Sequence, residues 1–267
     1  MTSAGSSERG RSPQGSDPAA WFGSVAAAYA RHRLSYPEPF FEAFCNHLPR
    51  ASRSTVWDCG CGNGQASLSL AARVGRVIAT DASAAQIEQA FPHPGIVYRQ
   101  ATAEASGLDD GSVDGVLVAA AIHWFAGEPF EREVRRVCRD GAVMAWSGSH
   151  APRFVLPEIQ RACERVDRDT LAAGWPPQRR WVDQAYQGLR FPGREWAFPK
   201  HLCIERRWHL RELIACMGTW SAVQRCRRAG RDPLPPLEAE LAPLWPEGGA
   251  ARLLIRWPFM GRWGQVQ

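Results

Sequence analysis

The sequence predicts an α/β protein built around a doubly wound, mostly parallel sheet. Between residues 54 and 148, short apolar segments alternate with stretches that have helical apolar spacing. Three closely spaced glycines follow the first apolar segment, and an acidic residue ends each of the first two. Strands that alternate with helices in this way form parallel βαβ units with right-handed crossovers. We therefore expect a seven-stranded sheet that is mostly parallel.

Each element of this core has a local signal. Buried strands are predicted from short apolar runs at residues 55–58, 76–80, 96–99, 113–119 and 142–146. Helices are predicted between them at residues 65–73, 84–91 and 130–139. Ser83 precedes the second of these helices and is placed to cap it.

The chain extends this core on both sides. Residues 1–18 are rich in Ser, Gly and charge and predict a disordered leader. Residues 19–53 predict N-terminal cap helices, and Pro37 suits the first turn of the second one. In residues 149–267 prolines interrupt a helical pattern, which predicts a helical lid followed by strands that complete the sheet. Within that part we expect strands at 203–208 and 252–257, with one or two helices over 210–228.

Composition limits the function classes. The charge of +5 comes from 32 Lys and Arg against 27 Asp and Glu, and no basic stripe interleaved with aromatics predicts a nucleic-acid partner. No apolar run reaches the roughly 18 residues of a membrane span, and residues 1–18 do not resemble a signal peptide. We expect a cytoplasmic protein with reduced cysteines. Cys59 and Cys61 have no second pair at zinc-finger spacing, so no metal site is expected.

The residues that indicate ligand binding are concentrated in and around a glycine-rich loop. Gly60, Gly62 and Gly64 let the backbone turn sharply and bring a ligand against bare main chain. Asp58 precedes them and can accept a hydrogen bond from a ligand ammonium, directly or through a water. Asp81 ends the next strand, at the same carboxyl edge of the sheet, where a carboxylate suits the two hydroxyls of a ribose.

A dinucleotide site is the main alternative. Its G-x-G-x-x-G signature fails here, because the third glycine position counted from Gly60 is Gln65. A nucleoside that carries an amino acid fits the loop better than one that carries phosphates. Two alternative functions stay open: a nicotinamide-dependent, NAD(P)-type oxidoreductase, which would use such a dinucleotide site, and a binding protein that keeps the fold without catalysis.

The loop resembles motif I of the class I methyltransferases that use S-adenosylmethionine. The surrounding residues 57–66, and residues 121–125 with the sequence Ala-Ile-His-Trp-Phe, resemble the trans-aconitate methyltransferase-like branch, which carries a methyltransferase type 11 domain. The likeness covers about residues 21–147 and continues more thinly at 219–225 and 256–258. It implies a Rossmann-like fold, S-adenosyl-L-methionine as cofactor, and methyl transfer to an oxygen (carboxylate or hydroxyl) or another nucleophile of a small molecule.

The resemblance also implies roles for individual residues. The three glycines lie against the methionine half of the cofactor. Asp81 binds the ribose and Ala82 lies beside the adenine. Ala103 and Glu104 match the segment whose backbone amide meets the adenine ring, although Thr102 stands where the family often has Asp. Residues 119–123, beginning with Ala119, pass beneath the methionine chain toward the substrate.

Two side chains, Arg33 and His123, have open roles. Arg33 is a candidate for the cofactor carboxylate, with Tyr29 and Tyr36 as neighbours, or else an ordinary surface charge. His123 is the candidate catalytic base, since its pKa range suits that task, or else a wall of the pocket. The 12 Trp favour an apolar or planar small-molecule substrate. The sequence indicates neither the acceptor nor the oligomeric state.

Overall fold

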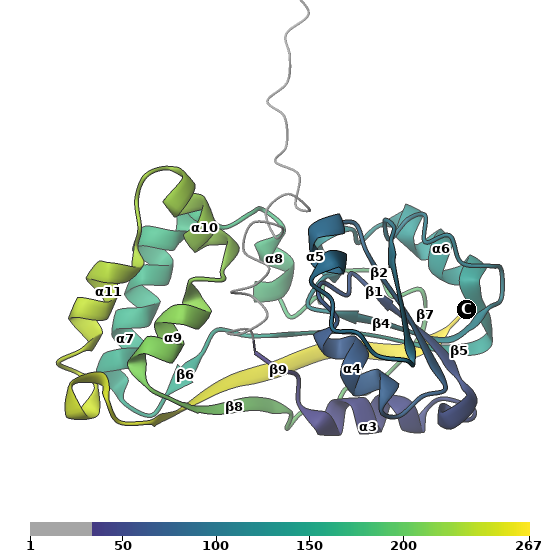
Figure 1. The fold of residues 1–267 in the computed structure, drawn as a ribbon, viewed down its shortest axis with the longest axis horizontal. Coiled ribbons are helices and arrows are strands. Elements are labelled where there is room, and N and C mark those ends of the chain that lie inside the picture. Colours follow the sequence, from purple (N-terminus) through teal and green to yellow (C-terminus); the bar gives the residue numbers. More distant parts are fainter. Residues whose placement is uncertain (1–33) are drawn as a thin grey trace, which may run out of the picture.

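The centre of the molecule is a parallel five-stranded sheet. The computed structural model describes residues 34–267 (Figure 1). The parallel strands lie in the order β3-β2-β1-β4-β5. Their bounds are Thr55–Cys59 (β1), Arg76–Asp81 (β2), Ile96–Gln100 (β3), Val113–Ala119 (β4) and Cys138–Ser149 (β5). The order reverses between β1 and β4, which is the point where open α/β sheets bind ligands at the carboxyl ends of the strands.

One long strand completes the sheet. The strand β9 (Leu253–Val266) runs antiparallel to β5, from Val143 opposite Gln265 to Ser149 opposite Phe259. It also pairs with three short strands: β6 (Arg153–Phe154), β7 (Gly193–Trp196) and β8 (Cys203–Trp208). Residues 34–267 thus contain nine strands in one sheet, two more than the expected seven. The predicted last strand, 252–257, was too short because Pro258, Gly261 and Gly264 are residues that usually end strands.

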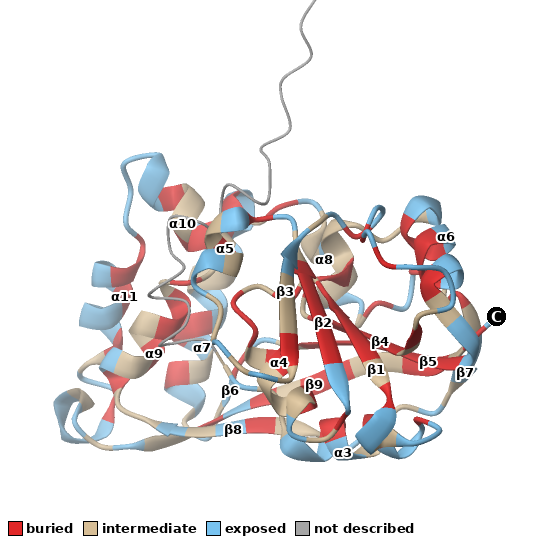
Figure 2. Ribbon diagram, turned by 45° about the vertical axis from the view of Figure 1, so that its right-hand side comes forward, coloured by how far each residue is buried: buried red, intermediate tan, exposed pale blue. Residues whose placement is uncertain are grey.

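Helices cover the two faces of the parallel sheet. α3 (Glu38–Asn46) and α4 (Gln65–Ala71) bury Phe40, Phe44 and Leu70 in one core cluster. α6 (Glu128–Val137) buries Phe130 and Val134 in the other. Figure 2 shows the central strands largely buried between these layers. The strand and helix alternation predicted for this core is confirmed.

The helix α5 (Ala84–Glu88) is shorter than expected, and its start differs in one detail. Ser83 occupies the N-cap position, but its side chain makes no capping hydrogen bond. The Ser83 carbonyl instead accepts from the N–H groups of Gln86 and Ile87. The prediction of a Ser83 side-chain cap was therefore wrong.

A helical lobe lies beside the sheet. It contains α7 (Pro157–Val166), α9 (Leu210–Met217), α10 (Ser221–Arg228) and α11 (Leu234–Leu241), while α8 (Arg179–Asp183) lies between this lobe and the core (Figure 1). The strands β8 and β9 run from the core into this lobe (Figure 1). The segment predicted as one or two helices over 210–228 is two. α11 was not predicted, because Pro235 and Pro236 resemble helix breakers, although both fall in its first turn where proline is tolerated.

Some predictions cannot be compared with the structure. The leader at 1–18, the first cap helix, and the candidates Tyr29 and Arg33 lie outside the described residues. Within residues 34–267 no helix has the length and apolar character that crossing a membrane requires.

Candidate functional site

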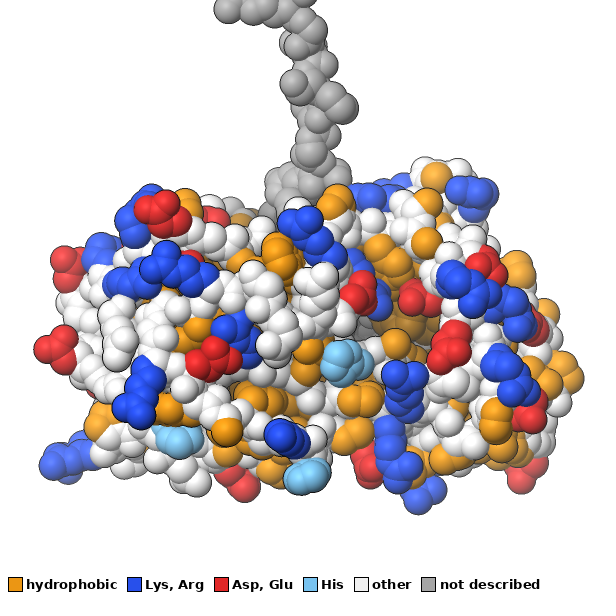
Figure 3. Space-filling view, turned by 180° about the vertical axis from the view of Figure 1, so that it is seen from behind, with side chains coloured by type: hydrophobic (Ala, Val, Ile, Leu, Met, Phe, Trp, Pro, Cys, Tyr) orange, Lys and Arg blue, Asp and Glu red, His pale blue; other side chains and the backbone are white. Residues whose placement is uncertain are grey.

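A cavity of about 350 Å³ lies between the carboxyl ends of the parallel strands and the helical lobe. Its core side is formed by the glycine loop, the end of β2 and the segment after β4. Its other side is formed by residues that follow β5, by α7 and α8, and by the start of α10. Seen from behind, a hollow lined by hydrophobic side chains opens between the two parts, with charged side chains at its rim (Figure 3).

The glycine loop is pinned over the neighbouring strand. The N–H groups of Gly60 and Cys61 both donate to the Thr80 carbonyl, at 2.8 and 2.9 Å. Gly60, Gly62 and Gly64 all have positive φ, of 70°, 56° and 89°. A Cβ on Gly60 would lie 2.7 Å from the Cβ of Ala121. Glycine is therefore required there both by conformation and by the close approach of the segment after β4.

Asp81 ties the ends of β1 and β2 together. Its Oδ2 accepts from the Gly62 N–H and its Oδ1 from the Ser83 N–H, both at 2.8 Å. Burial raises the pKa of Asp81, and these two backbone hydrogen bonds partly oppose that shift. The residue lines the cavity, and each carboxylate oxygen keeps accepting capacity for a ligand hydroxyl.

Asp58 lies beneath the loop rather than in the cavity. It is fully buried, and its Oδ2 accepts from the Ser67 hydroxyl at 2.5 Å. Its Oδ1 has no hydrogen-bond partner among the described residues. Burial, together with repulsion from Asp81, raises the pKa of Asp58 to about 7. Asp58 was predicted to accept from a ligand ammonium either directly or through a water. A position beneath the loop favours the contact through a water.

The residues expected near an adenine divide into two groups. Ala82 and Ala103 line the cavity. Glu104 is exposed and does not line it, so its side chain is not brought to the site. The Gln100 side-chain amide donates to the Ala82 carbonyl at 3.2 Å and steadies the turn after β2.

The segment after β4 carries a strained residue. Ala119, Ala120 and Ala121 line the cavity, and Ala120 has φ 54° although it bears a Cβ. Its N–H donates to the Ser147 carbonyl at 2.8 Å. Such strain persists only where the surroundings fix the backbone, and it is common at functional sites. The strained turn leads into His123, which is half-buried and lines the cavity.

The side of the cavity that belongs to the helical lobe, called the lid side below, contains polar groups that the sequence did not predict. The guanidinium of Arg179 lies 4.0 Å from the ring centroid of Trp175, and its Nε donates to Asp183 at 2.7 Å. His150 and Arg153 also line the cavity. Burial, and then the charge of Arg153, lowers the pKa of His150. Trp175 and Arg179 are four residues apart in the sequence, and this spacing could have predicted their contact. No sequence pattern indicated that His150 lies at the cavity.

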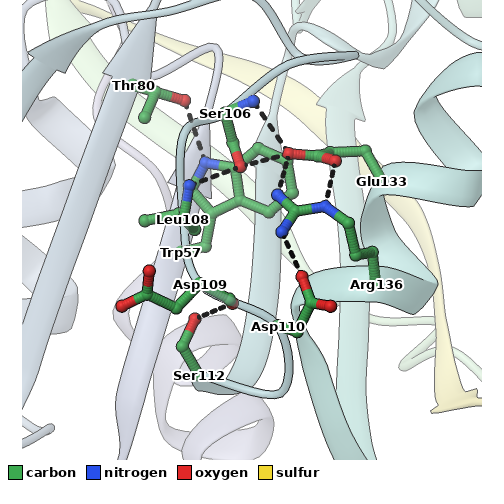
Figure 4. A network of polar contacts seen from close by, with 9 residues as sticks. All are labelled: Trp57, Thr80, Ser106, Leu108, Asp109, Asp110, Ser112, Glu133 and Arg136. Carbon is green, nitrogen blue, oxygen red and sulfur yellow. Dashed lines mark hydrogen bonds and ion pairs between the residues drawn. The ribbon is translucent and has the colours of Figure 1, made fainter.

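A polar network around the buried residues Glu133 and Ser106 supports the loop behind the adenine-side residues (Figure 4). Glu133 accepts from the Ser106 N–H at 2.8 Å and from the Ser106 hydroxyl at 2.5 Å. Arg136 pairs with Glu133 at 2.7 Å and with Asp110 at 2.5 Å. The hydrogen bond from Arg136 lowers the pKa of Glu133 to about 2. This network fixes the loop that connects Ala103 to β4.

The cysteines near the site are neutral thiols. Burial raises the pKa values of Cys59 and Cys61 well above the ordinary thiol range, and Asp58 adds to both shifts. Over residues 34–267 no three His, Cys, Asp or Glu side chains are grouped to hold a metal ion.

Known proteins resemble this chain in sequence and in fold. Residues 57–146 match the family model described as a methyltransferase domain. A solved structure from Anaeromyxobacter dehalogenans, named as a type II methyltransferase, is 40% identical, with a TM-score of 0.78, over 87% of this chain and 97% of that one. The chain belongs to the class I S-adenosylmethionine-dependent methyltransferases.

Two curated relatives extend the comparison of this methyltransferase. A Dictyostelium discoideum protein named as a methyltransferase is 29% identical over 223 residues, which cover 82% of this chain and 84% of that protein. The malonyl-[acyl-carrier protein] O-methyltransferase of Salmonella typhimurium is 30% identical over 179 residues, which cover 64% of this chain and 68% of that protein.

The family decides between the functions left open by the sequence. The protein is an S-adenosylmethionine-dependent methyltransferase, and the nicotinamide-dependent alternative was wrong. The cavity suits this cofactor, because the Asp81 carboxylate, the bare glycine backbone and the small side chains of Ala82 and Ala103 face it together. The trans-aconitate-like branch stays a prediction.

Proposed function

We propose that this methyltransferase transfers a methyl group to a carboxylate or hydroxyl oxygen of a small, largely apolar molecule. The observation that carries the proposal is one cavity shared by the cofactor loop and the lid, with His123 on its core side and Arg179 on its lid side. The relative named as an O-methyltransferase supports oxygen as the acceptor atom. A small molecule rather than a nucleic acid suits a cavity of this size and a net charge of only +5.

The core side holds the cofactor. Asp81 accepts from the ribose hydroxyls, Ala82 and Ala103 flank the adenine, and the glycine loop lies against the methionine half. When bound, S-adenosylmethionine supplies a methyl group on a sulfonium, which is a good leaving group. The protein therefore has mainly to align the acceptor with the methyl group in a dry cavity.

The lid side binds the acceptor. Trp175 and Trp220, whose ring centroids are 5.8 Å apart, give an apolar wall. Arg179 uses only its Nε toward Asp183 among the described residues, which leaves both terminal N–H₂ groups able to donate to an acceptor oxygen. A carboxylate acceptor needs no base, so His123 then serves as a wall. A hydroxyl acceptor loses a proton, and His123 is the group that takes it.

The first test is calorimetric titration with S-adenosylmethionine, S-adenosylhomocysteine and NADH. We expect saturable binding of the two adenosyl compounds and none of NADH. Acceptors are then screened as matched sets that share one carbon skeleton and differ as carboxylate, alcohol, amine or amide, with methylated product detected by mass spectrometry. Product from amines alone, or only from nucleic acid, would contradict the proposal.

Arg179 gives a sharper test of the acceptor side. In Arg179→Ala we expect KM for an accepted carboxylate or alcohol to rise about 10- to 100-fold, because a charge-assisted hydrogen bond contributes about 1.5–3 kcal/mol. Cofactor affinity is expected to stay the same. The matched control is Arg180→Ala, since Arg180 lies over the Trp181 ring and does not line the cavity. Equal KM values in the two variants would remove Arg179 from acceptor binding.

A further inference from the structure

A strained turn lies against the active-site cavity. Ala185 and Tyr186 are consecutive residues with φ of 49° and 62°, although both carry a Cβ. The left-handed region is disfavoured for such residues, and two in succession need strong support from their surroundings. The turn follows α8, so it belongs to the lid side of the cavity.

The Tyr186 side chain is fixed within the core side. It is 1% exposed, and its hydroxyl donates to the Ser147 carbonyl at 3.3 Å. The same carbonyl accepts from the strained Ala120 N–H. The Tyr186 ring lies nearly parallel to the His123 ring, at 16° and 6.5 Å between centroids, and both line the cavity. Tyr186 therefore forms the wall that faces His123.

An arginine that is distant in the sequence, Arg262 on β9, holds this turn. Nη1 of Arg262, on β9, donates to the Tyr186 carbonyl at 3.0 Å and also to the Leu189 carbonyl. Its Nε and Nη2 form a two-point pair with Glu195 at 2.7 and 2.6 Å. Only 12% of the Arg262 side chain is exposed. This planar fork, which binds a carboxylate and two carbonyls at once, is geometry that a lysine ammonium cannot reproduce.

We propose that Arg262, oriented by Glu195, is a positioning residue that fixes Tyr186 and thereby the surroundings of His123. The inference rests on the proposed function in one respect, that His123 faces the acceptor. Arg262 itself does not line the cavity, so it acts on the reaction through Tyr186. The strain at Ala185 and Tyr186 makes the turn depend on this support.

The test reads His123 directly by NMR of the full chain with ¹³C-labelled histidine. The His123 ring resonance is assigned from its absence in His123→Gln. We expect Arg262→Lys to shift or broaden that resonance, since the ring current of Tyr186 changes when the turn moves. Glu195→Gln is expected to act in the same direction and less strongly. The matched control is Arg256→Lys: Arg256 is also on β9 and pairs with Glu205 at 2.7 Å, and neither lines the cavity.

Kinetics supply the second readout. With an accepted acceptor, we expect Arg262→Lys to lower kcat/KM for the acceptor about 10- to 100-fold, while the Kd for S-adenosylhomocysteine stays unchanged. An unchanged His123 resonance in folded Arg262→Lys would overturn the inference. Where that variant does not fold, Glu195→Gln, which changes the carboxylate that orients Arg262, is judged by the same criterion. The NMR result does not depend on methyl transfer. Failure of the proposed function, seen as no methylated product, can therefore be distinguished from failure of this inference.

Discussion

At the scale of single residues, two carboxylates in neighbouring strands have different tasks. Asp81 faces the cavity with both oxygens already held by backbone N–H groups, so it is oriented before a ligand arrives. Asp58 lies behind the loop, fully buried, with one oxygen lacking a partner among the described residues. Asp81 faces the cavity, whereas Asp58 lies beneath the loop and is bonded to Ser67 on α4.

Asp81→Ala should weaken the cofactor complex. Losing hydrogen bonds to two ribose hydroxyls costs about 1–3 kcal/mol, or roughly a 5- to 150-fold rise in Kd for S-adenosylhomocysteine by calorimetry. Asp109→Ala is the control, because Asp109 is exposed and does not line this cavity. Equal affinities of Asp81→Ala and the parent protein would refute the ribose assignment.

Asp58 predicts a pH dependence of stability. Its pKa is about 7 in the folded protein and near 4 when unfolded, so below pH 4 both states are protonated. As the pH rises from about 4 to about 7, the unfolded state releases the proton and the folded state does not, and the free energy of unfolding falls by about 1.4 kcal/mol per pH unit. Urea unfolding at pH 5 and pH 8 measures this loss. Asp58→Asn should show much less of it, and parallel pH profiles of the two proteins would refute the prediction.

The sequence predicted the place of a residue where a carboxylate or a glycine directly follows a predicted strand. The positions of Asp81, Gly60 and Gly62 at the cavity could be predicted, because a carboxylate and bare backbone directly follow apolar runs, whereas Gly64 does not line the cavity. The burial of Asp58 could not be predicted, because it depends on Ser67 and on how the loop folds back over β2. The exposure of the Glu104 side chain was equally hidden, since it follows from the irregular loop between β3 and β4.

At the scale of elements, the glycine loop can be tested by a matched pair of substitutions. Gly60 and Gly107 have nearly the same φ, 70° and 68°, so alanine strains the backbone equally, by about 1–2 kcal/mol. A Cβ at Gly60 meets Ala121, whereas none of the described atoms lies within 4 Å of one at Gly107. We expect Gly60→Ala to lose more stability than Gly107→Ala in thermal unfolding, and to lose cofactor binding. Equal losses would show that the contact with Ala121 is unimportant.

The elements differed in how well their sequences specified them. Each parallel strand contains a short apolar run, so the pattern predicted it within a few residues. The strands β6 and β7 are short and exist because β9 offers them backbone partners, which no local pattern can indicate. Likewise, the lid residues Arg179 and His150 reach the cavity through the packing of α8 and the chain after β5, so only tertiary contacts reveal them.

At the scale of the whole molecule, β9 joins the two lobes. It pairs with β5 in the core through residues such as Trp263, and with β8 beside the lid through residues such as Trp257. Both tryptophans are buried. We therefore expect the core and the lid to unfold together. Urea unfolding followed by far-UV circular dichroism and by tryptophan fluorescence should give coincident transitions. Two separated midpoints would mean that the lobes are independent.

The late position of β9 also has a consequence for biosynthesis. During translation, the parallel strands have all left the ribosome when residue 149 emerges, but β5 has no partner on one edge until β9 arrives. An uncovered strand edge is a template for wrong pairing with other chains. We therefore expect slow translation of the chain between β5 and β9 to favour aggregation.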